Sequence, residues 1–193
     1  NGASYLKDGE EITVPGEELF SHYWLVEVPG VGSYEAYPNR DSLSYKETYD
    51  LKDVRTIYRG TFRPISHCDL WFVFGQMGFF KQKPVFDNLT GTVQEFILTK
   101  MMGLDKDDCL KSAISKKYKL AESSVVLKKM DWLGFFDETP VPITKGAGID
   151  VLTALMLEKM QYEDGECDMI ALHHEFIAEF AGKEQRITST LID

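Results

Sequence analysis

The segment from Tyr37 to Arg63 (YPNRDSLSYKETYDLKDVRTIYRGTFR) holds the side chains best suited to chemistry. Arg40 lies in a turn-rich run, PNRDS, and Arg63 ends a β-like run that contains Gly60 and Thr61. A guanidinium group is planar and always charged, so it binds a carboxylate or phosphate through two parallel hydrogen bonds. Glycine lets the backbone approach a ligand closely. Arg40, Thr61 and Arg63, at the ends of adjacent strands, are therefore predicted to form an anion-binding clamp.

The arginines have a simpler alternative, which is to pair with carboxylates of the same chain. The 193 residues contain 31 acids and 21 bases, and the formal net charge is −10. This excess of acids offers many ion-pair partners. It also argues against nucleic acid or an anionic membrane as a partner over the whole surface, without excluding a local basic pocket.

The elements that must position these residues follow from the periodicity of apolar side chains. Alternation and β-branched residues predict strands over residues 12–14, 33–37, 55–62, 168–180 and 186–192, with a weaker alternation over 22–29. A short helix is predicted over 44–49, and a hairpin turn over 181–184. Apolar stripes with the helical period predict helices over 69–80, 90–102, 107–119, 122–133 and 149–160.

The order of strands, helical block and strands predicts an α+β fold. A mixed β-sheet domain for substrate binding and dimerisation is expected at residues 1–64 and 165–193, with a helical subdomain inserted at residues 65–164. Three cysteines far apart in the chain favour free thiols in a reducing cytosol over disulfides. No apolar run approaches the length of a membrane span. We therefore expect a cytoplasmic protein without membrane contact.

Histidine and cysteine side chains give no recognisable metal site. His67-Cys68, His173-His174, Cys109 and Cys167 lack the spacing of a CxxC or HExxH motif. We expect no bound metal and interpret these residues as core or surface residues.

Taken together, the spaced motifs resemble those of the saccharopine dehydrogenase (saccharopine reductase) family. The family pattern, YPNRDS followed by RGTLRY, is similar to YPNRDS at 37–42 and RGTFR at 59–63 of this chain. The resemblance continues in MDWLGF at 130–135, VP at 141–142, CDMI at 167–170 and ITSTL at 187–191. It covers nearly the whole chain from about Gly30 onward.

This resemblance implies an enzyme of lysine metabolism. Members of the family reversibly join glutamate to 2-aminoadipate semialdehyde, and a nicotinamide cofactor reduces the imine to saccharopine or oxidises saccharopine back. It implies that Arg40 and Arg63 bind carboxylates of a saccharopine-like, acidic amino-acid adduct, and that Thr61 and Phe62 add backbone or hydroxyl hydrogen bonds. Phe62 stands where the family usually has leucine. Pro64 replaces the usual tyrosine, and this removes an N–H and a phenol near the substrate.

The family binds NAD(P) on an N-terminal Rossmann domain that carries a glycine-rich fingerprint. Gly30-Val31-Gly32 and Gly146-Ala147-Gly148 are near-matches, but neither has the third glycine or follows a buried strand that leads into a helix. We therefore interpret the chain as the C-terminal substrate-binding and helical portion of a longer enzyme, without its Rossmann domain. Alone, it is expected to be inactive.

Two alternatives stay open beside this interpretation. The chain could be a non-catalytic dimerisation and binding module, because the exposed face of a mixed sheet often pairs with its twin. It could also belong to a family member that acts on another amino-acid adduct. A homodimer is expected in the first interpretation as well.

Overall fold

A computed structural model describes residues 2–193 of the protein. Short antiparallel strands build its N-terminal part. β1 (Ala3–Lys7) pairs with β2 (Glu10–Val14), and β3 (Trp24–Val28), β4 (Gly32–Pro38) and β5 (Gly60–Arg63) form a second sheet in that order. The 3-10 helix η1 (Gly16–Ser21) connects β2 to β3, and helix α1 (Ser44–Thr48) lies between β4 and β5. The strands predicted over 12–14 and 33–37 and the short helix over 44–49 are confirmed.

The strand predicted over residues 55–62 was too long, since β5 begins only at Gly60. Ile57 instead makes one isolated antiparallel bridge to Leu6, with backbone N–O distances of 3.1 and 3.0 Å. The backbone amide of Asp8 donates to the hydroxyl of Thr56 at 3.0 Å. β-Branched residues signalled an extended chain correctly, but this stretch runs beside β1 and gains only one bridge there.

The helical block contains all five of the longer helices that the sequence predicts, each shifted by a few residues at its ends. They are α2 (His67–Met77), α3 (Val93–Phe96) with the π-helix η2 (Ile97–Met102), α4 (Leu110–Tyr118), α5 (Val125–Trp132) and α6 (Gly148–Lys159). A small sheet of β6 (Phe86–Asp87) and β7 (Lys145–Gly146), which the sequence did not indicate, lies within this block.

Thr92 begins α3 with a capping box, two residues after the start predicted for this helix. Its hydroxyl accepts from the Glu95 amide at 3.2 Å, and the Glu95 carboxylate accepts from the Thr92 amide at 2.9 Å. Two backbone donors at the helix start are satisfied in this way.

The large hydrophobic core lies entirely within the helical block, from Val73 to Leu155. At its centre Phe74, Phe79 and Phe135 are fully buried, with ring centroids 5.5 to 5.7 Å apart. Burial of each such side chain contributes about 1.5–3 kcal/mol. This core holds α2 in place, and the first turn of α2 reaches the N-terminal strands.

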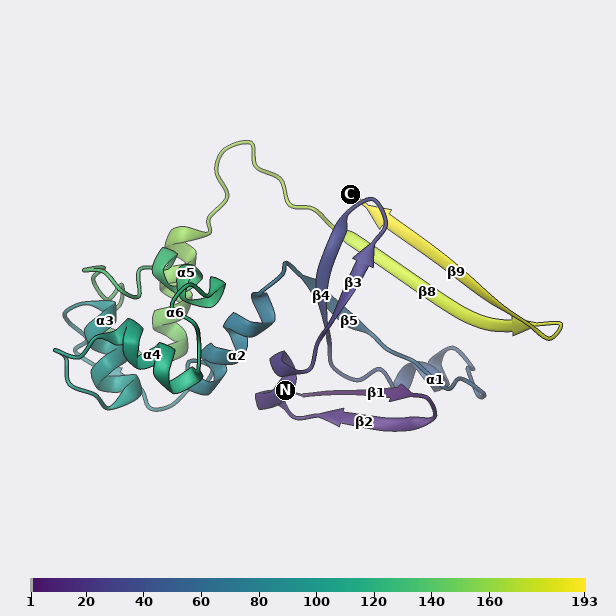
Figure 1. Ribbon diagram of the computed structural model, residues 1–193, viewed down its shortest axis with the longest axis horizontal. Coiled ribbons are helices and arrows are strands. Elements are labelled where there is room, and N and C mark those ends of the chain that lie inside the picture. The colour runs from purple at the N-terminus through teal and green to yellow at the C-terminus, as the bar shows by residue number, and fades with distance from the viewer. Residues whose placement is uncertain (1) are drawn as a thin grey trace.

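β8 (Ala171–Phe180) and β9 (Lys183–Ile192) form a long hairpin at the C-terminal end of the chain. The predicted turn is confirmed, with positive φ angles of 51° at Ala181 and 75° at Gly182, as a two-residue hairpin loop requires. Figure 1 shows the hairpin (yellow-green and yellow) on the side of the strands, away from helices α3 to α6.

These elements confirm the α+β class, with one difference in how the strands are arranged. We expected a single mixed sheet, whereas the described strands form four separate antiparallel sheets. An isolated parallel bridge between Ser4 and Asp41 connects β1 to the turn that follows β4. The difference arises because β8 and β9 pair only with each other. Within residues 2–193, no helix has the length and apolar character needed to cross a bilayer.

Candidate functional site

Thr61 and Arg63 lie on one face of β5, and Phe62 lies on the other, because side chains alternate along a strand. Thr61 pairs with Tyr37 of β4, and its hydroxyl accepts from the Asn39 side-chain amide at 2.9 Å. The Phe62 ring lies next to that of Tyr34, with centroids 6.1 Å apart. The Phe62 side chain therefore packs against the sheet, opposite the face that carries Thr61 and Arg63.

Arg40 lies in a turn that is fastened to β1. Its own backbone is left-handed, with φ 61°, and its carbonyl accepts from the Ser4 amide at 3.0 Å. The Asp41 carboxylate accepts from the Ser4 hydroxyl at 2.8 Å and from the Leu43 amide at 2.9 Å. The first of these bonds, with smaller help from the second, lowers the pKa of Asp41 below its usual range. The polar residues of PNRDS thus hold the turn, and the Arg40 side chain extends into solvent.

The antiparallel pairing of β4 with β5 decides how far apart the two arginines are. Arg40 follows the end of β4 at which Pro38 pairs with Gly60, whereas Arg63 pairs with Glu35. The backbone positions of Arg40 and Arg63 therefore lie towards opposite ends of β5, at least ~10 Å apart along the strand direction, which is the length of three residues. The register thus separates the backbone positions of the two cations, and the anion-binding clamp stays a prediction.

Neither arginine pairs with a carboxylate of the described chain. The ion pairs found among residues 2–193 join Lys52 to Asp50, Lys145 to Asp87 and Arg186 to Glu175. Arg63 donates from Nη1 to its neighbour, the Phe62 carbonyl, at 3.1 Å. The simpler alternative, in which the arginines pair internally, is thus not what this structure shows.

Glu35, the cross-strand neighbour of Arg63, is committed to helix α2. Its side chain is 2% exposed, and its carboxylate accepts from the Ser66 amide at 2.6 Å and the Cys68 amide at 2.7 Å. A carboxylate at the start of a helix satisfies free N–H groups and opposes the positive end of the helix dipole. Glu35 therefore joins β4 to α2 instead of neutralising Arg63.

A groove of about 370 Å³ opens beside Arg63, where η1, β4 and β5 meet α2. We call it the aromatic groove, and it is lined by Phe20, Tyr37, Arg63, His67, Trp71 and Phe80. Ring centroids are 5.1 Å apart for Phe20 and Tyr37, and 5.1 Å for His67 and Trp71. The groove thus combines one guanidinium group with a nearly continuous aromatic wall.

His67 is a residue of this groove that the sequence analysis did not select. Burial, with smaller contributions from the charges of Arg63 and Lys129, lowers the pKa of His67 to about 3. Its imidazole is consequently neutral near pH 7. In the sequence His67 stands four residues after Arg63, at the start of an apolar helix. This position alone does not distinguish a histidine of a binding site from a histidine of the core.

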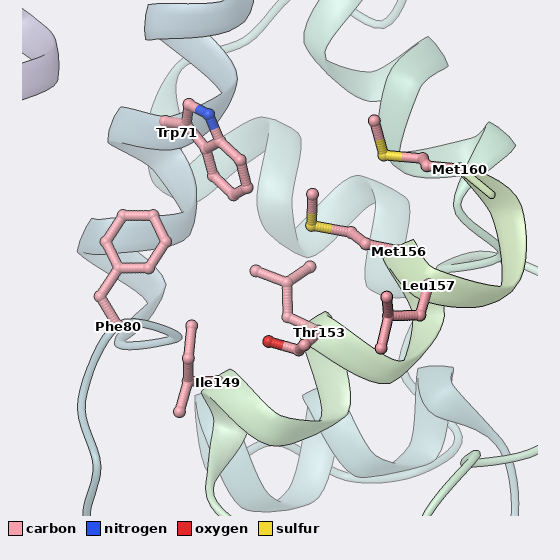
Figure 2. Close-up of a pocket in the computed structure, with 8 residues that line it drawn as sticks. Trp71, Phe80, Ile149, Thr153, Met156, Leu157 and Met160 are labelled. Atoms are coloured by element: carbon pink, nitrogen blue, oxygen red, sulfur yellow. The ribbon is translucent and has the colours of Figure 1, made fainter. Parts of the chain in front are cut away.

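A second groove of about 390 Å³ adjoins the first across Trp71 and Phe80, which line both. We call it the α6 groove. Figure 2 shows Ile149, Thr153, Met156, Leu157 and Met160 facing Trp71 and Phe80. Its walls carry one hydroxyl, that of Thr153, and no charged side chain.

The two glycine pairs considered as cofactor motifs have structural tasks. Gly30 and Gly32 form the β3–β4 turn with φ angles of 80° and 125°. Gly146 precedes α6, and a Cβ there would lie 2.8 Å from the side chain of Asp150, whose carboxylate accepts from the Ala147 amide at 2.8 Å. Backbone geometry and local packing thus account for both glycine pairs.

The cysteines and histidines lie apart in the fold. All three cysteines are free thiols; Cys68 is buried, and burial together with Glu35 raises its pKa to about 12. Across the described part of the chain, no three His, Cys, Asp or Glu side chains gather as metal ligands would.

Comparison with known proteins gives consistent matches over the whole chain. Residues 1–193 match the family model described as saccharopine dehydrogenase C-terminal domain. The chain is 34% identical to a saccharopine dehydrogenase [NADP(+), L-glutamate-forming] of Saccharomyces cerevisiae and 31% identical to an alpha-aminoadipic semialdehyde synthase of Arabidopsis thaliana. Both alignments cover 100% of this chain, with 44% of the yeast protein and 20% of the plant protein.

Among solved structures, the apo histidine-tagged saccharopine dehydrogenase (L-Glu forming) from Saccharomyces cerevisiae superposes with a TM-score of 0.88 at 30% identity. The match covers 100% of this chain and 44% of that structure. The chain therefore spans less than half the length of these relatives.

Proposed function

Since this chain belongs to the saccharopine dehydrogenase family, matching its C-terminal domain from residue 1 to residue 193, we propose that it is the substrate-binding portion of an NADP-dependent oxidoreductase. The reaction of the whole enzyme is the interconversion of saccharopine with glutamate and 2-aminoadipate semialdehyde, in lysine metabolism. The names of the yeast relatives, which specify NADP(+) and L-glutamate formation, support this assignment.

In this proposal the nicotinamide cofactor binds outside these 193 residues. The relatives are more than twice as long as the chain, and the glycine pairs of the chain form a turn and a helix start. The chain alone then binds substrate without hydride transfer.

The observation that carries the proposal is the pair of arginines without internal ion pairs, Arg63 on β5 and Arg40 in the turn after β4. Two cations whose backbone positions are at least ~10 Å apart along a strand suit an extended ligand with carboxylates at both ends. Arg40 and Arg63 bind these carboxylates. Thr61 retains a hydroxyl proton to donate, because its oxygen is the acceptor from Asn39, and Phe62 contributes through its backbone.

The remaining architecture is proposed to serve this site. Residues 1–64 and 165–193 form the sheet domain, and residues 65–164 form the helical subdomain, in agreement with a large core confined to residues 73–155. The enzyme is a cytoplasmic homodimer that uses the C-terminal hairpin as part of its interface.

The test is steady-state kinetics of Arg40→Gln and Arg63→Gln in the full-length enzyme. Loss of a charge-assisted, two-pronged contact costs about 1.5–3 kcal/mol, so kcat/KM for saccharopine is expected to fall roughly 10- to 150-fold, mainly through KM. Arg186→Gln, on the exposed hairpin, is the matched control and should leave KM unchanged. Normal kinetics for both site variants would refute the carboxylate contacts.

A second candidate function is a non-catalytic dimerisation and binding module. The observation that favours it is the hairpin, on which Leu172, Phe176, Ile187 and Leu191 are each more than half exposed. Analytical ultracentrifugation of the chain with and without saccharopine separates the two functions. A dimer that does not bind dicarboxylates would support the module.

A further inference from the structure

Aromatic rings surround the space next to the Arg63 guanidinium group on several sides. Phe20 from η1 lies between Tyr37 of β4 and Trp71 of α2, with ring centroids 5.1 and 6.3 Å away. Trp71 continues to Phe80 at 5.5 Å. Aromatic faces carry negative potential and attract cations, in particular the ammonium groups of ligands.

No carboxylate of the described chain lines this groove, although the protein is strongly acidic. Two acids on elements that line the groove, one on β4 and one on α2, are already occupied. Glu35 accepts from two amides at the start of α2, and Asp69 accepts from the Tyr23 hydroxyl at 2.9 Å. A ligand in the aromatic groove must therefore bring its own negative charge to Arg63.

His67 adds a directional acceptor for an ammonium group. Within residues 2–193 its ring nitrogens have no hydrogen-bond partner, and the ring lies in the groove wall against Trp71. The lowered pKa of His67 keeps the imidazole neutral, so one ring nitrogen is a donor and the other is an acceptor. A protonated imidazole would repel an ammonium group, whereas the neutral ring accepts from it.

We propose that the aromatic groove binds the α-amino-acid headgroup of the ligand: Arg63 binds the α-carboxylate, His67 accepts a hydrogen bond from the α-ammonium group, and the aromatic rings enclose it. This proposal rests on the proposed function and specifies which end of the adduct meets Arg63. The rest of the ligand extends along β5 towards Arg40. It does not enter the α6 groove, since that groove offers apolar walls and one hydroxyl (Figure 2).

The experiment compares L-2-aminoadipate with adipate, which lacks only the α-ammonium group, as ligands of the 193-residue chain in isothermal titration calorimetry. The chain is expected to bind L-2-aminoadipate roughly tenfold more tightly, as one hydrogen bond with a charged partner implies. His67→Phe should reduce this ratio to about one, while His67→Gln, which keeps a neutral donor and acceptor, should retain it. His174→Phe on the hairpin is the control.

The position of the ligand is checked with 5-fluorotryptophan, because the chain has three tryptophans. L-2-Aminoadipate should shift the ¹⁹F resonance of Trp71 and leave those of Trp24 and Trp132, which do not line the groove, in place. The Trp71 resonance also reports whether the His67 variants are folded.

The outcomes separate this inference from the proposed function. Equal binding of the two acids, a ratio that survives in His67→Phe, or an unshifted Trp71 resonance would overturn the headgroup site; if Arg63→Gln still weakened binding, the carboxylate contact would stand. If neither acid bound in an Arg63-dependent way, both proposals would be wrong.

Discussion

Ser66 and His67, consecutive residues at the start of α2, each occupy an environment unfavourable for their type. Ser66 has a left-handed backbone with φ 68°, a conformation that costs residues other than glycine roughly 1–2 kcal/mol. His67 is desolvated, and Cys68 is fully buried. The two amides bound to Glu35 hold this turn. The strained backbone of Ser66 thus lies next to the His67 imidazole that lines the aromatic groove. Backbone strain of this kind is common at functional sites.

Ser66→Gly is expected to stabilise the protein by about 0.5–1 kcal/mol, because glycine adopts positive φ without strain. The amide that binds Glu35 is retained. Ser124→Gly is the matched control: Ser124 caps α5 from an extended backbone, and its hydroxyl accepts from the Leu127 amide at 3.3 Å, so its loss should destabilise by a few tenths of a kcal/mol. Urea unfolding measures the free energy of unfolding of both variants. A Ser66→Gly variant less stable than the wild type would show that the backbone of Ser66 is not strained.

The lowered pKa of His67 predicts a pH dependence of stability. Between the folded pKa of about 3 and the ordinary value of 6.5, the unfolded chain binds a proton that the folded protein does not. The free energy of unfolding therefore rises with pH through this window and receives no further contribution from His67 above it.

His67→Gln removes this contribution, so its urea midpoint should fall less than that of the wild type between pH 7 and pH 4. His174→Gln, on the hairpin, controls for the loss of a histidine. If the urea midpoint changed with pH equally in the wild type and in His67→Gln, the imidazole would not be desolvated.

At the scale of elements, β4 and α2 are joined by a side chain instead of a helix cap. Ser66, at the cap position of α2, makes no side-chain hydrogen bond. The carboxylate of Glu35, on β4, instead accepts two short hydrogen bonds from amides at the start of α2. Because Arg63 pairs with Glu35 in register, the same residue sets the distance between the guanidinium group on β5 and the His67 ring on α2. The geometry of the aromatic groove thus depends on one buried carboxylate.

Glu35→Gln should destabilise the protein by about 2 kcal/mol. A glutamine offers one oxygen, so one of the two amides at the start of α2 would face an NH₂ group and remain unsatisfied. Glu11→Gln on exposed β2 is the control and should stay within about 0.5 kcal/mol of the wild type. Chemical denaturation at pH 7 compares the three proteins. If Glu35→Gln had the same free energy of unfolding as the wild type, the anchoring role of Glu35 would be contradicted.

At the scale of the whole molecule, the hairpin is a two-stranded ribbon with two unlike faces. Register puts Leu172 opposite Leu191 and Phe176 opposite Ile187 on one face, whereas His173, Glu175 and Arg186 lie on the other. The four apolar side chains are 51 to 57% exposed. On this face His174 and Ser189 lie between the two apolar pairs. Exposed apolar side chains gathered on one face are typical of an interface, and they support the homodimer proposed above.

Phe176→Ser combined with Ile187→Ser should weaken the dimer, because two anchors of the apolar face lose their contacts. Sedimentation velocity over a concentration series should show a dimer for the wild type and a shift to monomer for the double variant. Ile177→Ser removes an equally exposed apolar residue from the opposite face and should leave the dimer intact. A wild-type chain that stays monomeric at all concentrations would rule out self-association.

The helices could be predicted because each buries one stripe of its surface, and the stripe repeats with the helical period whatever lies opposite. The start of α3 and the hairpin turn lie close to their predicted positions, because the capping box at Thr92 and the turn at Ala181-Gly182 depend on local backbone chemistry. The small β6–β7 sheet could not be predicted, because two residues show no alternation. The limits of β5 were missed because they depend on whether residues 55–59 lie beside β1 or β4.

Residue types and their spacing were sufficient to predict the α+β class, the helical block and the family. They also singled out Arg40, Thr61, Phe62 and Arg63, whose role as substrate contacts stays a prediction. The arrangement of these residues in space follows from the fold. Antiparallel pairing moves Arg40 and Arg63 to opposite ends of β5. Glu35 turns away from Arg63 to α2, and His67 enters the wall of the groove. The physical reason is that residue type and spacing specify local conformation, whereas distances between segments far apart in the chain are set by the register of the strands and the packing of the helices.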